Sequence, residues 1–190
     1  MERKKHTNLD FKYIQTLDRD DIFSKYKKLF IKPSKYIYFG ANTLGLIPKD
    51  TEYISKKYFK NLSEKAVLGW RDENWLRINR DLGAKISKII GSSSKQVILS
   101  NSTSVNLFKI LYSAIKLSKN KKIILTDDKN FPTDYYIISS IAREYGLKVK
   151  VVPKNKLIQN INKDVSVITT TQVDYVTAEV SNLQNIAEKC

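Results

Sequence analysis

The chain has 190 residues, enough for a domain with its own hydrophobic core. Its hydrophobic fraction of 42% is ordinary for a globular protein and excludes wholesale disorder. No apolar run approaches the roughly 20 residues that span a bilayer, and the single cysteine, Cys190, excludes an internal disulfide framework. We therefore expect a cytoplasmic protein without a membrane partner.

The net charge of +15 is carried mainly by lysines scattered along the whole chain. Arginine, which binds phosphates and guanine edges with two hydrogen bonds, is much rarer than lysine here. Dispersed lysine favours a solvated surface over a nucleic-acid interface. A nucleic-acid role and the steering of an anionic substrate remain as the smaller alternatives.

The first half of the chain has helical patterns separated by loops. Apolar spacing predicts helices over 20–29, 53–62 and 75–89, the last ended by Gly91. A short apolar run at 36–39 predicts a strand that leads into a loop. We expect this part to divide into a tail with a helix and a segment with a strand, a loop and helices, over residues 1–35 and 36–91.

From residue 92 onward, short apolar runs alternate with helical patterns. Strands are predicted at 97–99, 123–125, 149–152 and 165–168, and helices at 104–117, 132–145, 157–161 and from 182. This alternation predicts an α/β fold with a mostly parallel sheet. The last predicted helix begins shortly before Cys190, and such a helix normally delivers another strand. We expect residues 92–190 to be the first part of a truncated domain.

Polar residues follow several of the predicted strands. The segment 100–106 is rich in hydroxyls and lies where a strand leads into a helix, so its side chains and free N–H groups suit a phosphate or carboxylate. A helix cap with nothing bound is the alternative for this turn. Segments 130–134 and 169–177 also follow strands, and parallel strands place these ends at one edge of the sheet. The sequence therefore predicts a shared cleft, and it shows no metal-site pattern.

The order of motifs resembles kynureninase, within the pyridoxal-phosphate-dependent enzymes of fold type I. The resemblance covers nearly the whole chain from about Tyr36 onward. Its motifs are Tyr38-Phe39-Gly40-Ala41-Asn42-Thr43-Leu44-Gly45, Gly69-Trp70-Arg71-Asp72, Ser102-Thr103-Ser104-Val105-Asn106, Phe131-Pro132-Thr133-Asp134 and Val173-Asp174-Tyr175-Val176-Thr177. The fold that it implies is part of a transferase-type large domain preceded by an amino-terminal helical segment.

The resemblance also implies roles at five positions. Thr103 and Ser104 would bind the phosphate of pyridoxal 5'-phosphate, and Phe131 would stack on the pyridine ring. Asp134 would line the cofactor pocket. Thr177 would lie beside the ring or its phenolic oxygen.

Two further positions, Asn42 and Thr43, are similar to substrate-side residues of the family and would serve the neighbouring subunit of a homodimer. The chain departs from the family at Ala178, where glycine is common. The family's aspartate for the pyridinium nitrogen and its Schiff-base lysine have no counterpart here. The resemblance thus implies no catalytic residue in this chain and negligible activity for the 190 residues alone.

The implied reaction is hydrolysis of the Cβ–Cγ bond of L-kynurenine or 3-hydroxykynurenine in tryptophan catabolism, toward NAD biosynthesis. Its products are anthranilate or 3-hydroxyanthranilate, and L-alanine. Two alternatives stay open at this point. One is another class V aminotransferase or a cysteine desulfurase-like enzyme, and the other is a non-catalytic remnant or basic binding module.

Overall fold

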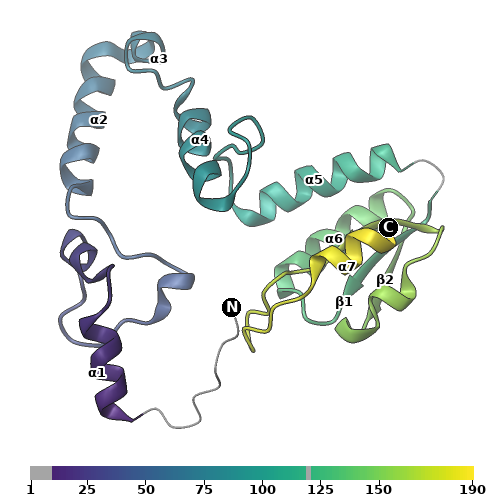
Figure 1. Ribbon diagram of the computed structural model, residues 1–190. Helices are drawn as coiled ribbons and strands as arrows, with labels where there is room; N and C mark the ends of the chain where they lie inside the picture. Colours follow the sequence, from purple (N-terminus) through teal and green to yellow (C-terminus); the bar gives the residue numbers. More distant parts are fainter. Residues whose placement is uncertain (1–9, 119–120) are drawn as a thin grey trace. The chain divides into compact units, whose positions relative to one another are not determined.

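The computed structural model describes residues 10–118 and 121–190, and its contacts divide the chain into two units, one through Ile78 and one from Asn79. Residues 1–9, which belong to the expected segment 1–35, lie outside the described residues. The first unit contains α1 (Phe11–Arg19), α2 (Thr51–Lys65), α3 (Gly69–Asp72) and 3₁₀ helices at Ser24–Leu29, Gly40–Asn42 and Ala66–Leu68 (Figure 1). The expected division at 35 and 91 remains a prediction.

The first helix lies earlier in the chain than the sequence pattern predicts. The predicted helix at 20–29 is wrong, because an α-helix occupies Phe11–Arg19 and only a 3₁₀ helix forms at Ser24–Leu29. Asp10 is the residue that caps α1, accepting a hydrogen bond from the Lys12 N–H at 3.4 Å. Asp21 instead accepts from the N–H of Phe23 at 2.9 Å and holds a tight turn.

The predicted strand at 36–39 is also wrong. This segment forms bends and leads into the 3₁₀ helix Gly40–Asn42. The Tyr38 hydroxyl donates to the Leu44 carbonyl at 2.6 Å, which folds the segment back into a loop. A strand needs a neighbour for its backbone groups, and among the described residues no ladder forms at 36–39.

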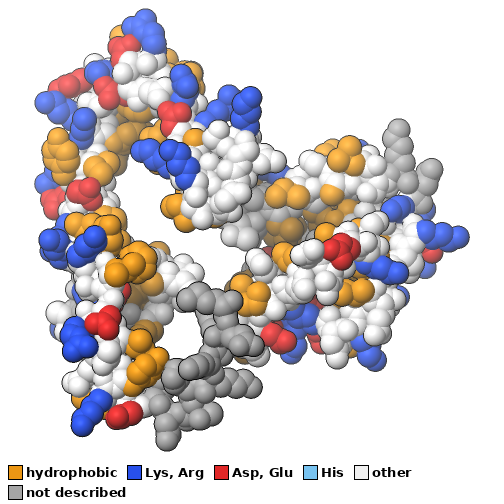
Figure 2. Space-filling model, viewed as in Figure 1, with side chains coloured by type: hydrophobic (Ala, Val, Ile, Leu, Met, Phe, Trp, Pro, Cys, Tyr) orange, Lys and Arg blue, Asp and Glu red, His pale blue; other side chains and the backbone are white. Residues whose placement is uncertain are grey.

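The first unit has little buried surface of its own. Within residues 10–78, Gly69 is the one buried position, and a Cβ added there would lie 2.4 Å from the ring of Trp75. Large apolar side chains remain exposed, including Ile37 at 83% and Phe39 at 89%. Figure 2 shows apolar side chains on the surface of both units. The stable core of the described chain therefore belongs to the second unit.

That second unit is built on a parallel sheet. Its strands are β1 (Ile123–Asp127), β2 (Lys148–Val152) and β3 (Val165–Thr169), in the order β2-β1-β3. Its helices are α4 (Ile78–Ile90), α5 (Thr103–Leu117), α6 (Pro132–Glu144) and α7 (Leu183–Lys189), with 3₁₀ turns at Lys154–Lys156 and Ile158–Asn160. Three of the predicted strands are confirmed, and the two 3₁₀ turns replace the short helix predicted at 157–161.

Consecutive residues of β1 face opposite sides of the sheet and create two cores. Ile124 is fully buried with α5 and α6 on one face, and Leu125 is fully buried on the other face, against which Ile186 of α7 packs (Figure 1). The first core contains Leu111, Ile115, Ile124, Ile138, Ile141 and Ala142, and the second contains Leu125, Val152, Leu157 and Val165. Burial on both faces explains why the start of β1 is a continuous apolar run in the sequence.

The predicted strand at 97–99 is wrong, because this segment packs against α4 without joining the sheet. The Leu99 N–H donates to the Asn79 carbonyl at 3.2 Å. At Gly83, an added Cβ would lie only 2.2 Å from the Val97 carbonyl oxygen. The close approach of helix and segment therefore depends on the missing side chain of Gly83.

The expected fold class is confirmed: an α/β unit with a parallel sheet follows an amino-terminal helical segment. Over the residues that the structure describes, no helix combines the length and apolar character that crossing a bilayer requires. The carboxyl ends of β1, β2 and β3 meet at one edge of the sheet, and the candidate site is built there.

Candidate functional site

Side-chain hydrogen bonds join the ends of β1 and β3 on the face covered by α5 and α6. The Thr126 hydroxyl donates to the Thr169 carbonyl at 3.0 Å. The Asn130 amide donates to the Thr126 hydroxyl oxygen at 2.5 Å and to the Thr169 carbonyl at 3.1 Å. The Thr171 hydroxyl donates to the Asn130 amide oxygen at 2.5 Å. This group, the Asn130 network, ties the loop after β1 to the end of β3.

A second connection lies on the opposite face of the same edge. Asp127 is 4% exposed, and its carboxylate accepts from the Thr170 hydroxyl at 2.6 Å and from the Lys129 N–H at 2.8 Å. A buried carboxyl group without hydrogen-bond partners would be costly, and these two bonds offset that cost. Both faces of the β1–β3 edge are therefore held by polar contacts, which fixes the positions of the loops that follow.

The start of α5 has free donors for an anion. Ser102 caps the helix by accepting from the Val105 N–H at 3.4 Å. Thr103 and Ser104 are the first two residues of this 15-residue helix, where N–H groups have no partner within the helix. Thr103 is exposed and Ser104 is half-buried. Hydroxyls, N–H groups and the positive end of the helix dipole together suit a phosphate.

Phe131 lies at the start of α6 with about half of its surface open, at 48% exposure. Its ring meets the ring of Tyr175 edge-on, with centroids 5.0 Å apart and planes at 70°. Pro132 follows at the first helical position, and the Asp134 N–H donates to the Phe131 carbonyl at 2.9 Å. Burial raises the pKa of the Asp134 carboxyl above its usual value. The Phe131 ring is thus held from one side and offers an aromatic face to a flat ligand.

A small hairpin follows β3 and presents Tyr175 and Thr177. Val173 and Val180 pair as an antiparallel bridge. Inside the hairpin, the Asp174 carboxylate accepts from the backbone N–H groups of Thr177 and Val176, both at 2.8 Å. Both hydrogen bonds lower the pKa of Asp174, and the one from the Thr177 N–H has the largest effect. The hairpin is therefore held by its own carboxylate.

Ala178 shows how the chain accommodates its departure from the family pattern. Its φ of 59° lies in the left-handed region, where glycine is favoured. The Ala178 N–H donates to the Asp174 carbonyl at 2.9 Å and closes the turn. The backbone thus keeps a glycine-type conformation with an alanine in place.

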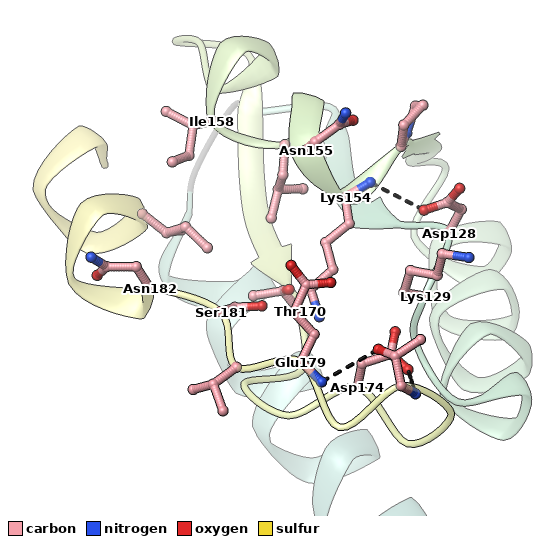
Figure 3. Close-up of a pocket in the computed structure, with 15 residues that line it drawn as sticks. Asp128, Lys129, Lys154, Asn155, Ile158, Thr170, Asp174, Glu179, Ser181 and Asn182 are labelled. Atoms are coloured by element: carbon pink, nitrogen blue, oxygen red, sulfur yellow. Dashed lines mark hydrogen bonds between the residues drawn. The ribbon is translucent and has the colours of Figure 1, made fainter. Parts of the chain in front are cut away.

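Two of the predicted site residues, Asp134 and Thr177, line different hollows at this edge. A cavity of about 330 Å³ beside α5 contains Asn130 and Asp134. A cavity of about 520 Å³ on the other face contains Thr177, Asp128 and Lys154 (Figure 3). The structure therefore brings Asp134 and Phe131 together at the start of α6 and places Thr177 in a neighbouring hollow.

Lys154 is one of several charged residues that line the larger cavity, and sequence reasoning missed it. Its Nζ is buried, without a hydrogen-bond partner among the residues that the structure describes. Figure 3 shows the side chain entering the cavity toward Thr170 and Glu179. The positive charge contributes to the lowered pKa of Asp174. A lysine in a 3₁₀ turn after β2 has no sequence signature that distinguishes it from the many surface lysines.

Thr126 and Asp127 were missed as well, because they read as the end of an apolar strand. Asn130 and the threonines at 169–171 stand out in the sequence as polar strand ends, but their partners depend on the pairing of β1 with β3. Asn42 and Thr43 lie in the first unit, both exposed, at the 3₁₀ helix Gly40–Asn42 and the residue after it. The roles expected of all seven predicted residues remain predictions.

No protein-family model matches the chain. Among curated proteins, it is 30% identical over 185 residues to the kynureninase of Deinococcus radiodurans, covering 94% of this chain and 45% of that protein. It is 29% identical over 181 residues to the kynureninase of Pseudomonas fluorescens, covering 88% and 42%. The kynureninase of Christiangramia forsetii is 26% identical over 198 residues, covering 93% and 47%.

A solved structure of similar fold is a mutant of C-DES with glycine covalently linked to its pyridoxal phosphate cofactor. The TM-score is 0.68 at 14% sequence identity, and the match covers 88% of this chain and 45% of that chain. The chain thus has the fold of part of a pyridoxal-phosphate-dependent enzyme of fold type I. It resembles the amino-terminal part of kynureninases and spans a little under half the length of the relatives that it matches.

Proposed function

We propose that this chain forms the phosphate-binding and ring-stacking part of a pyridoxal 5'-phosphate site in a kynureninase-like hydrolase. The whole enzyme would hydrolyse the Cβ–Cγ bond of L-kynurenine or 3-hydroxykynurenine to anthranilate or 3-hydroxyanthranilate and L-alanine. The observation that carries the proposal is the 26–30% identity to curated kynureninases over about nine tenths of this chain. The likeness to a pyridoxal-phosphate enzyme supports the same fold.

The donor set at α5 fits the phosphate of this cofactor. The phosphate would lie against the first turn of the helix, where Thr103 and Ser104 offer two hydroxyls and two N–H groups. These donors bind a dianion more strongly than they bind a neutral group, because hydrogen bonds to charged acceptors are the stronger ones. The turn would thus anchor the cofactor and contribute nothing to the chemistry of the reacting bond.

The start of α6 would hold the pyridine ring. Phe131 would stack on one face, while Tyr175 supports the edge of Phe131 from the hairpin. Asp134 would line the pocket, where burial raises the pKa of its carboxyl. Thr177 would lie at the ring side, and Asn42 and Thr43 would serve the substrate in the neighbouring subunit of a homodimer. A cytoplasmic location belongs to the same proposal.

Pyridoxal phosphate, when bound, supplies an electron sink for carbanion chemistry. The residues of this chain would orient it: the α5 turn fixes the phosphate, and Phe131 excludes water from one ring face. The loop that carries Phe131 is held at the strand edge, through the bonds of Asp127 on one face and of Asn130 on the other. Orientation of this kind is the contribution that a binding scaffold makes to catalysis.

Titration of the purified chain with pyridoxal 5'-phosphate and with pyridoxal, by equilibrium dialysis, tests the proposal. We expect saturable binding with a preference for the phosphorylated compound. Thr103→Ala and Ser104→Ala should each weaken binding of pyridoxal phosphate by roughly tenfold, the loss of one charge-assisted hydrogen bond of about 1.5 kcal/mol. Binding of pyridoxal should change little.

Ser113→Ala is the matched control. Ser113 lies on the same helix, is exposed, and its hydroxyl donates to the Lys109 carbonyl of its own helix at 2.9 Å. This variant should bind both compounds as the parent chain does. Equal affinity for the two compounds in the parent chain, or no saturable binding of either, would contradict a phosphate site at α5.

A further inference from the structure

Asn130 makes more side-chain contacts to other segments than its neighbours in the loop between β1 and α6. Its amide nitrogen donates to the Thr126 hydroxyl oxygen and the Thr169 carbonyl, and its amide oxygen accepts from the Thr171 hydroxyl. The donor–acceptor distances are 2.5, 3.1 and 2.5 Å. One side chain thus joins the loop to β1, to β3 and to the segment after β3.

The pattern of donors and acceptors requires an amide. The Thr126 hydroxyl already donates to the Thr169 carbonyl, so toward Asn130 it can only accept. The Thr171 hydroxyl donates to the amide oxygen, and the Thr169 carbonyl, which already accepts from Thr126, accepts a second hydrogen bond from the amide nitrogen. Aspartate at this position would keep the acceptor but lose both donors, and leucine would lose all three bonds. Asparagine supplies both donors and the acceptor, so its loss would remove three hydrogen bonds from part-buried groups.

The two rings at the candidate site are attached to the two segments that Asn130 joins. Phe131 is the next residue in the loop, and Tyr175 lies four positions beyond Thr171 in the hairpin. Their centroids are 5.0 Å apart in an edge-on contact, although both side chains are about half exposed, at 48% and 56%. Two exposed rings keep such a geometry only if their backbones are held in register. Asp127 and Asn130 both connect these segments, and of the two side chains Asn130 lies next to Phe131 in the chain.

We infer that Asn130 is a positioning residue that holds the Phe131 ring against Tyr175 and so sets the face on which a cofactor ring stacks. The inference rests on the proposed function for the cofactor ring, but the contact between Phe131 and Tyr175 exists without any ligand. Asn130 itself needs no contact with cofactor or substrate. Its effect passes through the backbone of the loop, one residue away from Phe131.

The test measures the ring contact directly, by nuclear Overhauser effects between Phe131 and Tyr175 in the full 190-residue chain with labelled aromatic residues. In the parent chain these cross-peaks should be strong. Asn130→Ala and Asn130→Asp should abolish them or reduce them at least threefold. Cross-peaks between Leu111 and Ile138, in the core between α5 and α6, report whether each variant is folded.

Two further variants sharpen the test. Asn160→Ala is the matched control, because the Asn160 amide donates to the Lys156 carbonyl within its own 3₁₀ turns, at 2.8 Å, and bonds no other segment among the described residues. It should leave the ring cross-peaks unchanged. Thr171→Val removes a single bond of the Asn130 network and keeps the shape of the side chain, so it serves if the Asn130 variants do not fold. It should reduce the cross-peaks measurably.

Unchanged cross-peaks between Phe131 and Tyr175 in folded Asn130 or Thr171 variants would overturn the inference. Cofactor titration separates it from the proposed function. Asn130→Ala should weaken pyridoxal and pyridoxal phosphate alike, by roughly fivefold to tenfold, the usual size of an aromatic contact, whereas Thr103→Ala affects the phosphorylated compound alone. Failure of the parent chain to bind either compound would refute the proposed function and leave the ring-contact result to decide on Asn130.

Discussion

Gly83 of α4 gives a strong test of the packing against segment 97–99. In Gly83→Ala, the new methyl carbon would lie 2.2 Å from the Val97 carbonyl oxygen and 2.9 Å from the Ile98 Cα. Both obstacles are backbone atoms, so rotation of a side chain cannot relieve the overlap. The segment must move away from α4, which also breaks the 3.2 Å hydrogen bond from the Leu99 N–H to the Asn79 carbonyl.

The expected size follows from three contributions. Overpacking of this kind typically costs about 1–3 kcal/mol, and the lost hydrogen bond costs about 1 kcal/mol more. Alanine inside a helix gains about 1 kcal/mol over glycine, which offsets part of the loss. The net loss in free energy of unfolding should therefore be about 1–3 kcal/mol.

Urea unfolding followed by far-ultraviolet circular dichroism measures this loss. Gly45→Ala is the control, because an added Cβ there has no heavy atom within 4 Å and should change stability by less than about 0.5 kcal/mol. A Gly83→Ala chain as stable as the parent, or more stable, would show that helix propensity prevails. It would refute the packing of 97–99 on α4.

Two further predictions concern the hairpin after β3. Ala178→Gly should relieve the strain of a left-handed φ of 59°, because a non-glycine residue in this region costs about 1 kcal/mol. We expect the hydrogen-exchange protection of the residue 178 N–H to rise by roughly threefold to tenfold. Unchanged or lower protection would contradict a strained turn. Because the folded pKa of Asp174 is lowered, its stabilising effect should be present above the unfolded pKa and lost as the pH falls through the folded pKa. Asp174→Asn should therefore reduce the difference between neutral and acid pH in the hydrogen-exchange protection of the hairpin N–H groups. If that pH dependence is unaltered in the variant, the Asp174 carboxylate is not its cause.

The strands of the second unit could be predicted because local sequence and tertiary packing agree there. Runs such as 123–125 are buried on both faces, so apolar composition alone identifies them. The runs at 36–39 and 97–99 look similar locally, yet no neighbouring strand pairs with either among the residues described. An apolar run is therefore a strand only where a partner exists, and that is a property of the whole fold.

The candidate site shows the same division. The loops at 130–134 and 169–177 could be placed at one edge, since parallel strands end together. The bonds of Asn130 to Thr126 and Thr171 could not be predicted, because they depend on the register between β1 and β3, which includes an irregularity at Ile123/Ile124. Thr177 lines the same cavity as Lys154, and this placement depends on the hairpin after β3, which the sequence motif alone does not predict.

We propose that the carboxyl edge of this sheet binds pyridoxal phosphate, with the phosphate at the start of α5 and the ring at Phe131. Amide chemical-shift mapping of the labelled 190-residue chain during addition of pyridoxal 5'-phosphate tests this proposal. We expect saturable shifts concentrated at Thr103, Ser104 and Phe131, with the α5 shifts absent when pyridoxal is added instead. Shifts spread over surface lysines without saturation, with the α5 turn unaffected, would refute the proposed site.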